Sequence, residues 1–368
     1  MQKKFSFLWL AFRRLLTSLV YKVKREFSLP IKPIFINFSA TYRCNSRCLM
    51  CNNWQRYQKD PQKVKEELTV ADWEKIFKRD KDWFSSVRHF GIAGGEPFLK
   101  TDLVELVRLI HKDLPKVKIG LQTNGLEPKI IALKLKEILS FCPGITLAVS
   151  IDGMEKTHDK VRGVKGSFRR VLETVRIAHR LGIKEITAGM TVVKENHREI
   201  TEVIERMKKL GIEVSFYPAD QGEYYHTERK ENRKDQVVVK SLVNTLEKFP
   251  GDYFKDNLRR ILLGSSKRSL PCYSGWTSLV LDPYGEIKPC VLRSESLGNL
   301  KKEPLAEILT SSKAEKIRKE IKKCSCFSLC EVSTSAVIDP WDVVFWFLFK
   351  ADKKTFLQKA EERLKAIS

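Results

Sequence analysis

Three cysteines with short, unequal spacing are the residues whose types most directly suggest chemistry. Cys44, Cys48 and Cys51 form a C-x3-C-x2-C pattern after an apolar and β-branched run that ends at Phe38. Iron–sulfur clusters usually take four cysteine ligands, so three thiolates on one loop would leave one iron of a cubane without a protein ligand. A zinc site is the alternative, since Cys48 and Cys51 alone fit a C-x2-C half-site.

A second group of cysteines lies near the C-terminus, and Cys142 stands alone as a predicted small buried hydrophobe. We find no secretory signal, so we expect a cytoplasmic protein whose clustered cysteines bind metal rather than form disulfides. The members of the second group are Cys272, Cys290, Cys324, Cys326 and Cys330.

Alternating strands and helices must position the first cysteine loop. Because six consecutive βα units imply a parallel sheet with right-handed crossovers, and a closed barrel has eight, we predict an α/β fold with an open, partial (β/α)6 TIM-like barrel. The predicted strands are 34–39, 87–92, 117–122, 145–151, 185–193 and 213–217, and the predicted helices are 70–79, 103–112, 128–140, 167–181, 197–210 and 234–248.

The remaining segments define the predicted domain organisation. The barrel is expected over residues 30–250. A hairpin at 278–288 and two short helices near 304–310 and 312–323 indicate a small cysteine-rich domain over residues 251–340. Residues 1–29 form a separate N-terminal unit, and residues 341–368 form an aromatic and basic tail.

Residues 1–29 are predicted to form a basic amphipathic helix. Apolar residues recur at helical spacing between lysines and arginines, and the run is too short to span a bilayer, which needs ~20 residues. The helix either lies in an anionic membrane interface, together with residues 341–354, or covers a hydrophobic edge of the barrel. A membrane-peripheral location is therefore an additional expectation. The formal net charge of +23 suits nucleic acid, an anionic membrane or acidic ligands and does not choose among them.

Polar motifs follow the first four predicted strands, where a parallel βα barrel carries its active site. The first strand leads into the cysteine loop, and a zinc ribbon would not predict the motifs that follow the next three strands. Those motifs contain Gly94, Gly95 and Glu96 after the second strand, Asn124 after the third, and Ser150 and Asp152 after the fourth.

On these motifs, residues 34–218 resemble the core domain of radical S-adenosylmethionine (SAM) enzymes. The resemblance implies a [4Fe–4S] cluster on Cys44, Cys48 and Cys51, with SAM bound at its open iron. Met50 stands where the family commonly has an aromatic residue. The implied SAM-binding residues are Gly94, Gly95 and Glu96 for the amino group, Ser150, Asp152 and Arg162 for the ribose or carboxylate, and Asn124, although Asn-Gly is also a common turn.

The second cysteine group resembles the SPASM/twitch extensions of radical SAM enzymes. Twelve residues separate Cys272 from Gly285, four separate Gly285 from Cys290, and Cys326 and Cys330 form a C-x3-C pair. The resemblance implies one auxiliary [4Fe–4S] cluster on Cys272, Cys290, Cys330 and either Cys324 or Cys326, with a structural zinc as the alternative.

We therefore predict an enzyme that reductively cleaves SAM to a 5′-deoxyadenosyl radical and abstracts hydrogen from its substrate. The family resemblance suggests a peptide or protein substrate, or a lipid- or membrane-linked metabolite, and a reduced flavodoxin or ferredoxin as electron donor. A radical SAM RNA-modifying enzyme and a zinc-stabilised nucleic-acid-binding protein are the alternatives. Nucleic acid is not the expected partner, because we find no RNA-binding signature. No substrate-side acid or base can be assigned from the sequence.

Overall fold

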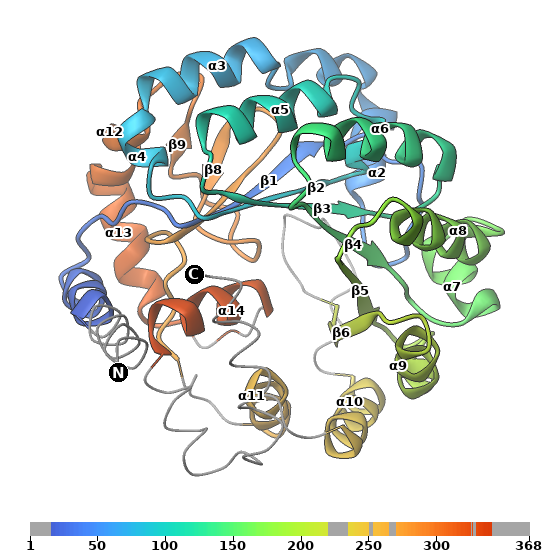
Figure 1. The fold of residues 1–368 in the computed structure, drawn as a ribbon. Coiled ribbons are helices and arrows are strands. Elements are labelled where there is room, and N and C mark those ends of the chain that lie inside the picture. Colours follow the sequence, from blue (N-terminus) through green and yellow to red (C-terminus); the bar gives the residue numbers. More distant parts are fainter. Residues whose placement is uncertain are drawn as a thin grey trace, which may run out of the picture.

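The computed structural model describes residues 16–219, 235–249, 253–264, 270–324, 326 and 329–340 (Figure 1). Its first six strands follow one another in chain order with helices between them, as predicted. They are β1 (Phe35–Thr41), β2 (His89–Gly94), β3 (Lys118–Thr123), β4 (Thr146–Ser150), β5 (Glu185–Val192) and β6 (Glu213–Pro218).

The six strands lie side by side in the order of the chain, and each pairs in parallel with the next. The described sheet continues beyond β1, and its order is β6-β5-β4-β3-β2-β1-β7-β8-β9. Its two outer strands are therefore β6 and β9. Helices α3, α5, α6, α8 and α9 lie along the outside of the curved sheet (Figure 1). This arrangement confirms the predicted partial barrel.

The predicted helices agree closely with the structure, except that the one predicted over 197–210 begins as a 3-10 turn. Helices α2, α4, α7, α11 and α14 were not predicted, and α2, α4 and α7 are too short for a clear apolar period. The helices are α2 (Asn53–Lys59), α3 (Val70–Arg79), α4 (Lys81–Phe84), α5 (Leu103–Asp113), α6 (Pro128–Phe141), α7 (Glu155–Arg162), α8 (Ser167–Arg180), α9 (Ile200–Lys208), α10 (Gln236–Lys248), α11 (Tyr253–Leu262), α12 (Leu305–Thr310), α13 (Ser312–Ile321) and α14 (Leu329–Ile338), with 3-10 helices at Pro61–Glu66, Pro97–Leu99 and His197–Glu199.

Helix α3 shows how a sequence signal fixes an element against the sheet. Thr69 and Asp72 form a capping box, in which each side chain bonds the other residue's backbone N–H, so the helix begins where it was predicted to begin. Its apolar side carries the fully buried Trp73, whose ring packs against Phe38 on β1 and Phe90 on β2. The core therefore lies between the sheet and its outer helices.

The predicted C-terminal hairpin is present as β7 (Ser278–Leu281) and β8 (Glu286–Lys288), followed by the short β9 (Gly298–Asn299). Sequence patterns did not indicate where this hairpin lies relative to the six-stranded sheet. Strand β7 pairs in parallel with β1, with Phe35 opposite Ser278 and Phe38 opposite Leu281. The C-terminal part of the chain therefore extends the sheet of the barrel.

Of the predicted N-terminal helix, the described residues 16–26 are helical, whereas residues 1–15 lie outside the described part. The predicted tail, residues 341–368, also lies outside it. None of the described helices combines the length and the apolar character needed to cross a membrane. The helix packs beside α13, where Lys322 Nζ bonds Glu26 Oε1 at 2.9 Å.

Arg318 on α13 joins this N-terminal segment to the C-terminal part. Its side chain is almost fully buried. Its Nε donates to the Ser28 carbonyl oxygen at 2.9 Å and its Nη1 donates to the Leu309 carbonyl oxygen at 3.0 Å. Because both acceptors are backbone atoms, a shorter or apolar side chain cannot replace the two bonds.

We expect Arg318→Met to lower the free energy of unfolding by about 2 to 4 kcal/mol, since it leaves two buried carbonyl groups without donors. Lys319→Met is the matched control. Lys319 is exposed on the same helix and pairs only with Glu315 one turn away, so its loss should cost no more than about 0.5 kcal/mol. Urea unfolding of both variants measures the difference, and equal losses would contradict the proposed role of Arg318.

Candidate active site

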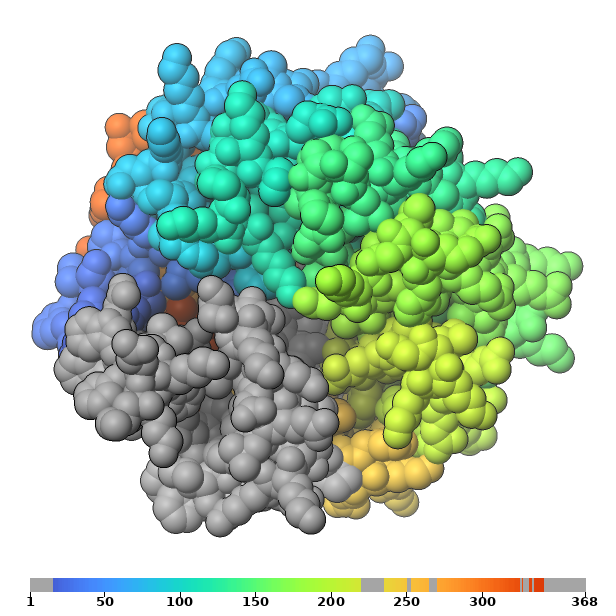
Figure 2. All heavy atoms as spheres, viewed as in Figure 1, coloured from blue at the N-terminus to red at the C-terminus, as the bar shows by residue number. Residues whose placement is uncertain are grey.

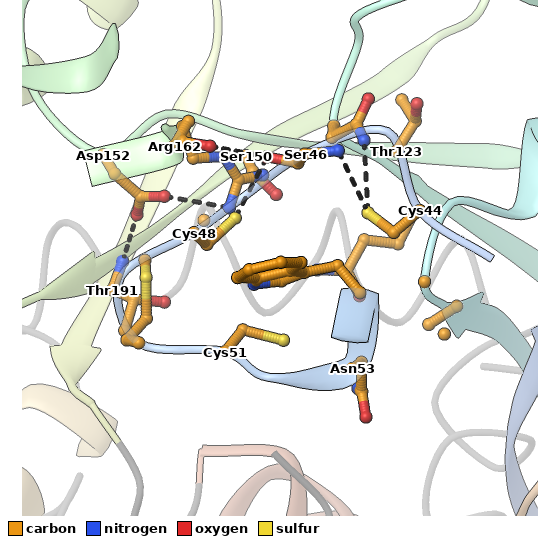
Figure 3. Close-up of a pocket in the computed structure, with 18 of the residues that line it drawn as sticks. Cys44, Ser46, Cys48, Cys51, Asn53, Thr123, Ser150, Asp152, Arg162 and Thr191 are labelled. Atoms are coloured by element: carbon orange, nitrogen blue, oxygen red, sulfur yellow. Dashed lines mark hydrogen bonds and ion pairs between the residues drawn. The ribbon is translucent and has the colours of Figure 1, made fainter. Parts of the chain in front are cut away.

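A cavity lies at the carboxyl ends of the parallel strands (Figure 3). Each of the first six strands, or the loop that follows it, contributes to its wall. The lining includes Cys44, Cys48 and Cys51 after β1, Gly94 and Gly95 at β2, Asn124 after β3, Ser150 at β4, Thr191 at β5 and Tyr217 at β6. The predicted convergence of strand ends on one site is therefore present in the fold.

The three cysteines of the first loop line the same cavity (Figure 3). Two neighbouring residues, Ser46 and Asn124, approach their sulfur atoms. The Ser46 N–H donates to Cys44 Sγ at 3.4 Å, and the Ser46 hydroxyl lies 3.1 Å from Cys48 Sγ. The Asn124 side-chain amide approaches Cys44 Sγ at 3.8 Å. These donors would stabilise negative charge on the sulfurs of a thiolate-bound cluster.

The raised pKa values of these thiols bear on how they could bind a metal cluster. Burial raises the pKa of Cys44 to about 12 and that of Cys51 to about 11, so the thiols need a strong positive charge to become ligands. Within the described residues, no three Cys, His, Asp or Glu side chains converge on a single ion position.

Gly94 and Gly95 hold the end of β2 directly against the cysteine loop. The Gly95 N–H donates to the Thr41 carbonyl at 2.7 Å. A Cβ on Gly95 would lie 2.2 Å from the Arg43 carbonyl oxygen, and one on Gly94 would lie 2.4 Å from that of Thr41. Close approach of two backbones, in addition to any approach to a ligand, therefore requires glycine at both positions.

Glu96 is placed differently from the other predicted SAM-binding residues. Its side chain is buried behind the cavity wall, and all its observed bonds are internal. Oε1 accepts from Thr123 Oγ1 at 2.9 Å and from the Phe98 N–H at 3.2 Å, and Oε2 accepts from the Asn124 N–H at 2.7 Å. Burial raises the pKa of Glu96 to about 7, while these three donors act in the opposite direction. Its role toward SAM stays a prediction, and its structural role is to join the ends of β2 and β3.

Asp152 and Arg162 meet in the wall of the cavity. Arg162 Nη1 lies 3.1 Å from Asp152 Oδ2, and both side chains are largely buried. Asp152 Oδ1 accepts from the Thr191 N–H at 2.7 Å, which joins the loop after β4 to β5 (Figure 3). The Arg162 carbonyl oxygen in turn accepts from the Arg47 N–H at 2.9 Å. The end of α7 thus supports the cysteine loop, and Ser150 lines the cavity nearby.

Several lining residues were not predicted from the sequence. Thr191 and Tyr217 stand at the ends of β5 and β6, so the strand-end rule could have found them if it had been applied beyond β4. Trp54 also lines the cavity, and the Arg47 guanidinium lies 5.0 Å from the centre of its ring. Ser46, within the cysteine loop, carries no pattern that would have identified it.

The second cysteine group lies beside β7 and β8. Cys272 and Cys290 are both buried, and burial raises the pKa of Cys290 to about 12, with smaller contributions from Glu331 and Cys272. The Arg293 guanidinium approaches Cys324 Sγ at 3.9 Å. Cys326 is partly exposed, and the side chain of Cys330 lies outside the described part. Because of its raised pKa, Cys290 would need a nearby cation to lose its proton and bind a cluster. The role of this group as cluster ligands stays a prediction.

Two family models match the chain. The model described as radical SAM superfamily matches residues 38–207, and the SPASM model, described as an iron–sulfur cluster-binding domain, matches residues 272–331. The first match covers the cysteine loop and the ends of β2 to β5, whereas β6 lies beyond it. The second begins at Cys272 and ends just after Cys330.

Among characterised proteins, the chain is similar to AlbA of Bacillus subtilis, an antilisterial bacteriocin subtilosin biosynthesis protein. The two are 27% identical over 302 residues, which cover 77% of this chain and 61% of AlbA. The chain is 25% identical over 304 residues to SkfB of the same organism, a sporulation killing factor maturation protein, with 82% of this chain and 70% of SkfB covered. The chain therefore spans about three fifths of the length of AlbA.

Among solved structures, the fold is similar to that of Streptococcus suis SuiB bound to S-adenosylmethionine. The TM-score is 0.61 at 17% identity, with 81% of this chain and 70% of SuiB covered. SuiB is also known bound to its precursor peptide SuiA. At this identity the likeness shows a shared fold.

His158 on α7 supports the Asp152 position from behind. The Asp152 N–H donates to His158 Nδ1 at 3.1 Å, and the imidazole is fully buried against the ring of Phe168. Burial lowers the pKa of His158 to about 3, whereas an unfolded histidine titrates near 6.5. Between these values the unfolded chain binds a proton that the folded chain does not, so stability falls as the pH drops below about 6.5.

We expect His158→Asn to remove this loss of stability at low pH. An amide oxygen can accept the hydrogen bond from the Asp152 N–H without titrating. Between about pH 7.5 and about pH 5.5, the wild type should lose about 1.4 kcal/mol more unfolding free energy than the variant. Urea unfolding at the two pH values measures this. His179→Asn, at an exposed position of α8, should retain the wild-type pH dependence. Identical pH dependence in wild type and His158→Asn would show that His158 is not held neutral.

Proposed function

Because the chain belongs to the radical SAM superfamily and carries a C-terminal SPASM domain, we propose that it is an enzyme that modifies a peptide or protein substrate by hydrogen abstraction. Its cofactors are SAM and a [4Fe–4S] cluster, and the SPASM domain implies an auxiliary iron–sulfur cluster. The observation that carries the proposal is the cavity in which three cysteines of the loop after β1 meet residues from the ends of the five strands that follow.

The chain's own residues have distinct tasks in this site. Cys44, Cys48 and Cys51 would hold the cluster, which with bound SAM supplies a 5′-deoxyadenosyl radical when it receives an electron. The Arg162 guanidinium, fixed by Asp152, presents a positive charge to the cavity and suits a carboxylate such as that of SAM. We propose a reduced flavodoxin or ferredoxin as the electron donor.

The peptide class of substrate rests on the relatives. AlbA and SkfB are named for the biosynthesis of a bacteriocin and the maturation of a killing factor, and SuiB binds a precursor peptide. The matches to these three proteins cover 77%, 82% and 82% of this chain, respectively. A lipid- or membrane-linked substrate is the second candidate, and the exposed apolar helix face described below favours it.

Cys48→Ala should remove a cluster ligand. We expect the anaerobically purified variant to lose most SAM cleavage, measured as 5′-deoxyadenosine, and to lose about half of its iron and sulfide if one auxiliary cluster remains. Cys142→Ala is the matched control, because Cys142 is buried at the end of α6, away from both cysteine groups. Zinc in place of iron, or unchanged SAM cleavage in Cys48→Ala, would overturn the enzymatic assignment.

The substrate class can be tested without knowing the substrate. We expect the small-peptide fraction of an extract from the source organism to stimulate 5′-deoxyadenosine formation, and protease treatment of that fraction to abolish the stimulation. Transfer RNA is the competing substrate, with ribonuclease treatment as its control. Stimulation by RNA that is lost only after ribonuclease treatment would favour an RNA-modifying enzyme and contradict the peptide proposal.

A further inference from the structure

The N-terminal helix, residues 16–26, has a polar face and an apolar face, and their orientation relative to the protein is unusual. Residues 18, 21, 22 and 25 fall on one face at helical spacing, and residues 16, 19, 20, 23 and 27 fall on the other. The first set contains mostly polar side chains, whereas the second set is entirely apolar. In most surface helices the apolar face packs against the core.

Here the polar face contacts the rest of the protein. Arg25 Nε donates to the Cys272 carbonyl at 2.8 Å, and its guanidinium lies against the rings of Tyr273 and Trp276. On the same face, buried Ser18 bonds Asp339 at 3.5 Å, and Lys22 pairs with the same carboxylate at 3.1 Å. The helix is therefore fixed by interactions that do not use its apolar side chains.

The apolar face points outward. Phe27 is 69% exposed and Leu19 is 57% exposed, and the other members of this face, Leu16, Val20 and Val23, are each close to half exposed. The segment lies at the left edge of the molecule in Figures 1 and 2. Five large apolar side chains on one helix face form a contiguous patch, and such a patch marks an interaction surface.

A basic helix lies beside this apolar face. Helix α13 is held against the N-terminal segment by Arg318 and Lys322. Its exposed positions include Lys313 and Lys316, and the exposed Lys323 follows its C-terminal end. The whole chain carries a formal charge of +23. An apolar helix face bordered by lysines is complementary to a surface that is both apolar and negatively charged.

We propose that this face, made of Leu16, Leu19, Val20, Val23 and Phe27, docks the protein on an anionic phospholipid bilayer. The helix lies in the interface plane, its apolar side chains enter the boundary between headgroups and acyl chains, and the lysines of α13 contact lipid phosphates. The polar face keeps its bonds to the protein, so docking needs no rearrangement of the described fold.

Co-sedimentation with vesicles tests the proposal on the full chain with its clusters reconstituted. We expect the wild type to bind vesicles of equal parts phosphatidylcholine and phosphatidylglycerol, and to bind pure phosphatidylcholine vesicles more weakly. Leu19→Gln/Val23→Gln/Phe27→Gln should reduce binding at least about tenfold. The matched control is Ile130→Gln/Leu133→Gln/Val237→Gln, which alters equally apolar, exposed positions on α6 and α10 and should bind like the wild type.

A second variant isolates the charge contribution. Lys313→Gln/Lys316→Gln/Lys323→Gln should weaken binding to anionic vesicles and flatten its dependence on salt. SAM cleavage in solution should be unchanged in all three variants, which separates this proposal from the proposed function. Equal binding by the two apolar variants, or no wild-type binding, would overturn the proposal. A concentration-dependent dimer that only the Leu19/Val23/Phe27 variant loses would instead assign the face to a second copy of the chain.

Discussion

The contact between the end of β2 and the cysteine loop is the constraint on which the site depends. The Gly95 N–H donates to the Thr41 carbonyl and the Glu96 N–H donates to the Arg43 carbonyl, both at 2.7 Å. No side chain fits between these backbones, since a Cβ on Gly95 would overlap Arg43. Two short backbone hydrogen bonds therefore hold the loop directly against the end of β2. The loop therefore takes its position from the sheet.

Hydrogen bonds of buried polar side chains connect the other strand ends to this contact. Glu96 accepts hydrogen bonds from the Thr123 hydroxyl and the Asn124 N–H at the end of β3. The Asn124 side-chain amide in turn donates to Asn45 in the cysteine loop. Asp152 joins the loop after β4 to β5. Both carboxylate oxygens of Glu96 accept hydrogen bonds, and Asp152 pairs its second oxygen with Arg162. These bonds hold the strand ends in place around the cavity.

Sequence reasoning reached the elements and most of the residues but not these connections. Helix α3 was predicted at its observed bounds because its capping box and apolar period are local signals. The Glu96 bonds join residues 27 and 28 positions apart, and the pairing of β7 with β1 uses backbone atoms common to every residue type. Such contacts are decided by packing, so no local pattern can reveal them. For the same reason Asp152 and Arg162 could be predicted as site residues, whereas their ion pair could not.

The pairing of β7 with β1 also determines how the proposed docking helix relates to the cavity. Because the two strands are parallel, the residues before each of them lie at the same edge of the sheet. The Ile34 N–H bonds the Thr277 carbonyl at this edge, and Arg25 bonds Cys272 nearby. The cavity lies at the opposite, carboxyl edge, where Tyr284 in the β7–β8 turn bonds Tyr57 on α2 at 3.1 Å. A bilayer contacting the helix would therefore leave the carboxyl edge clear. This separation makes membrane docking compatible with a peptide substrate that reaches the cavity from the aqueous side.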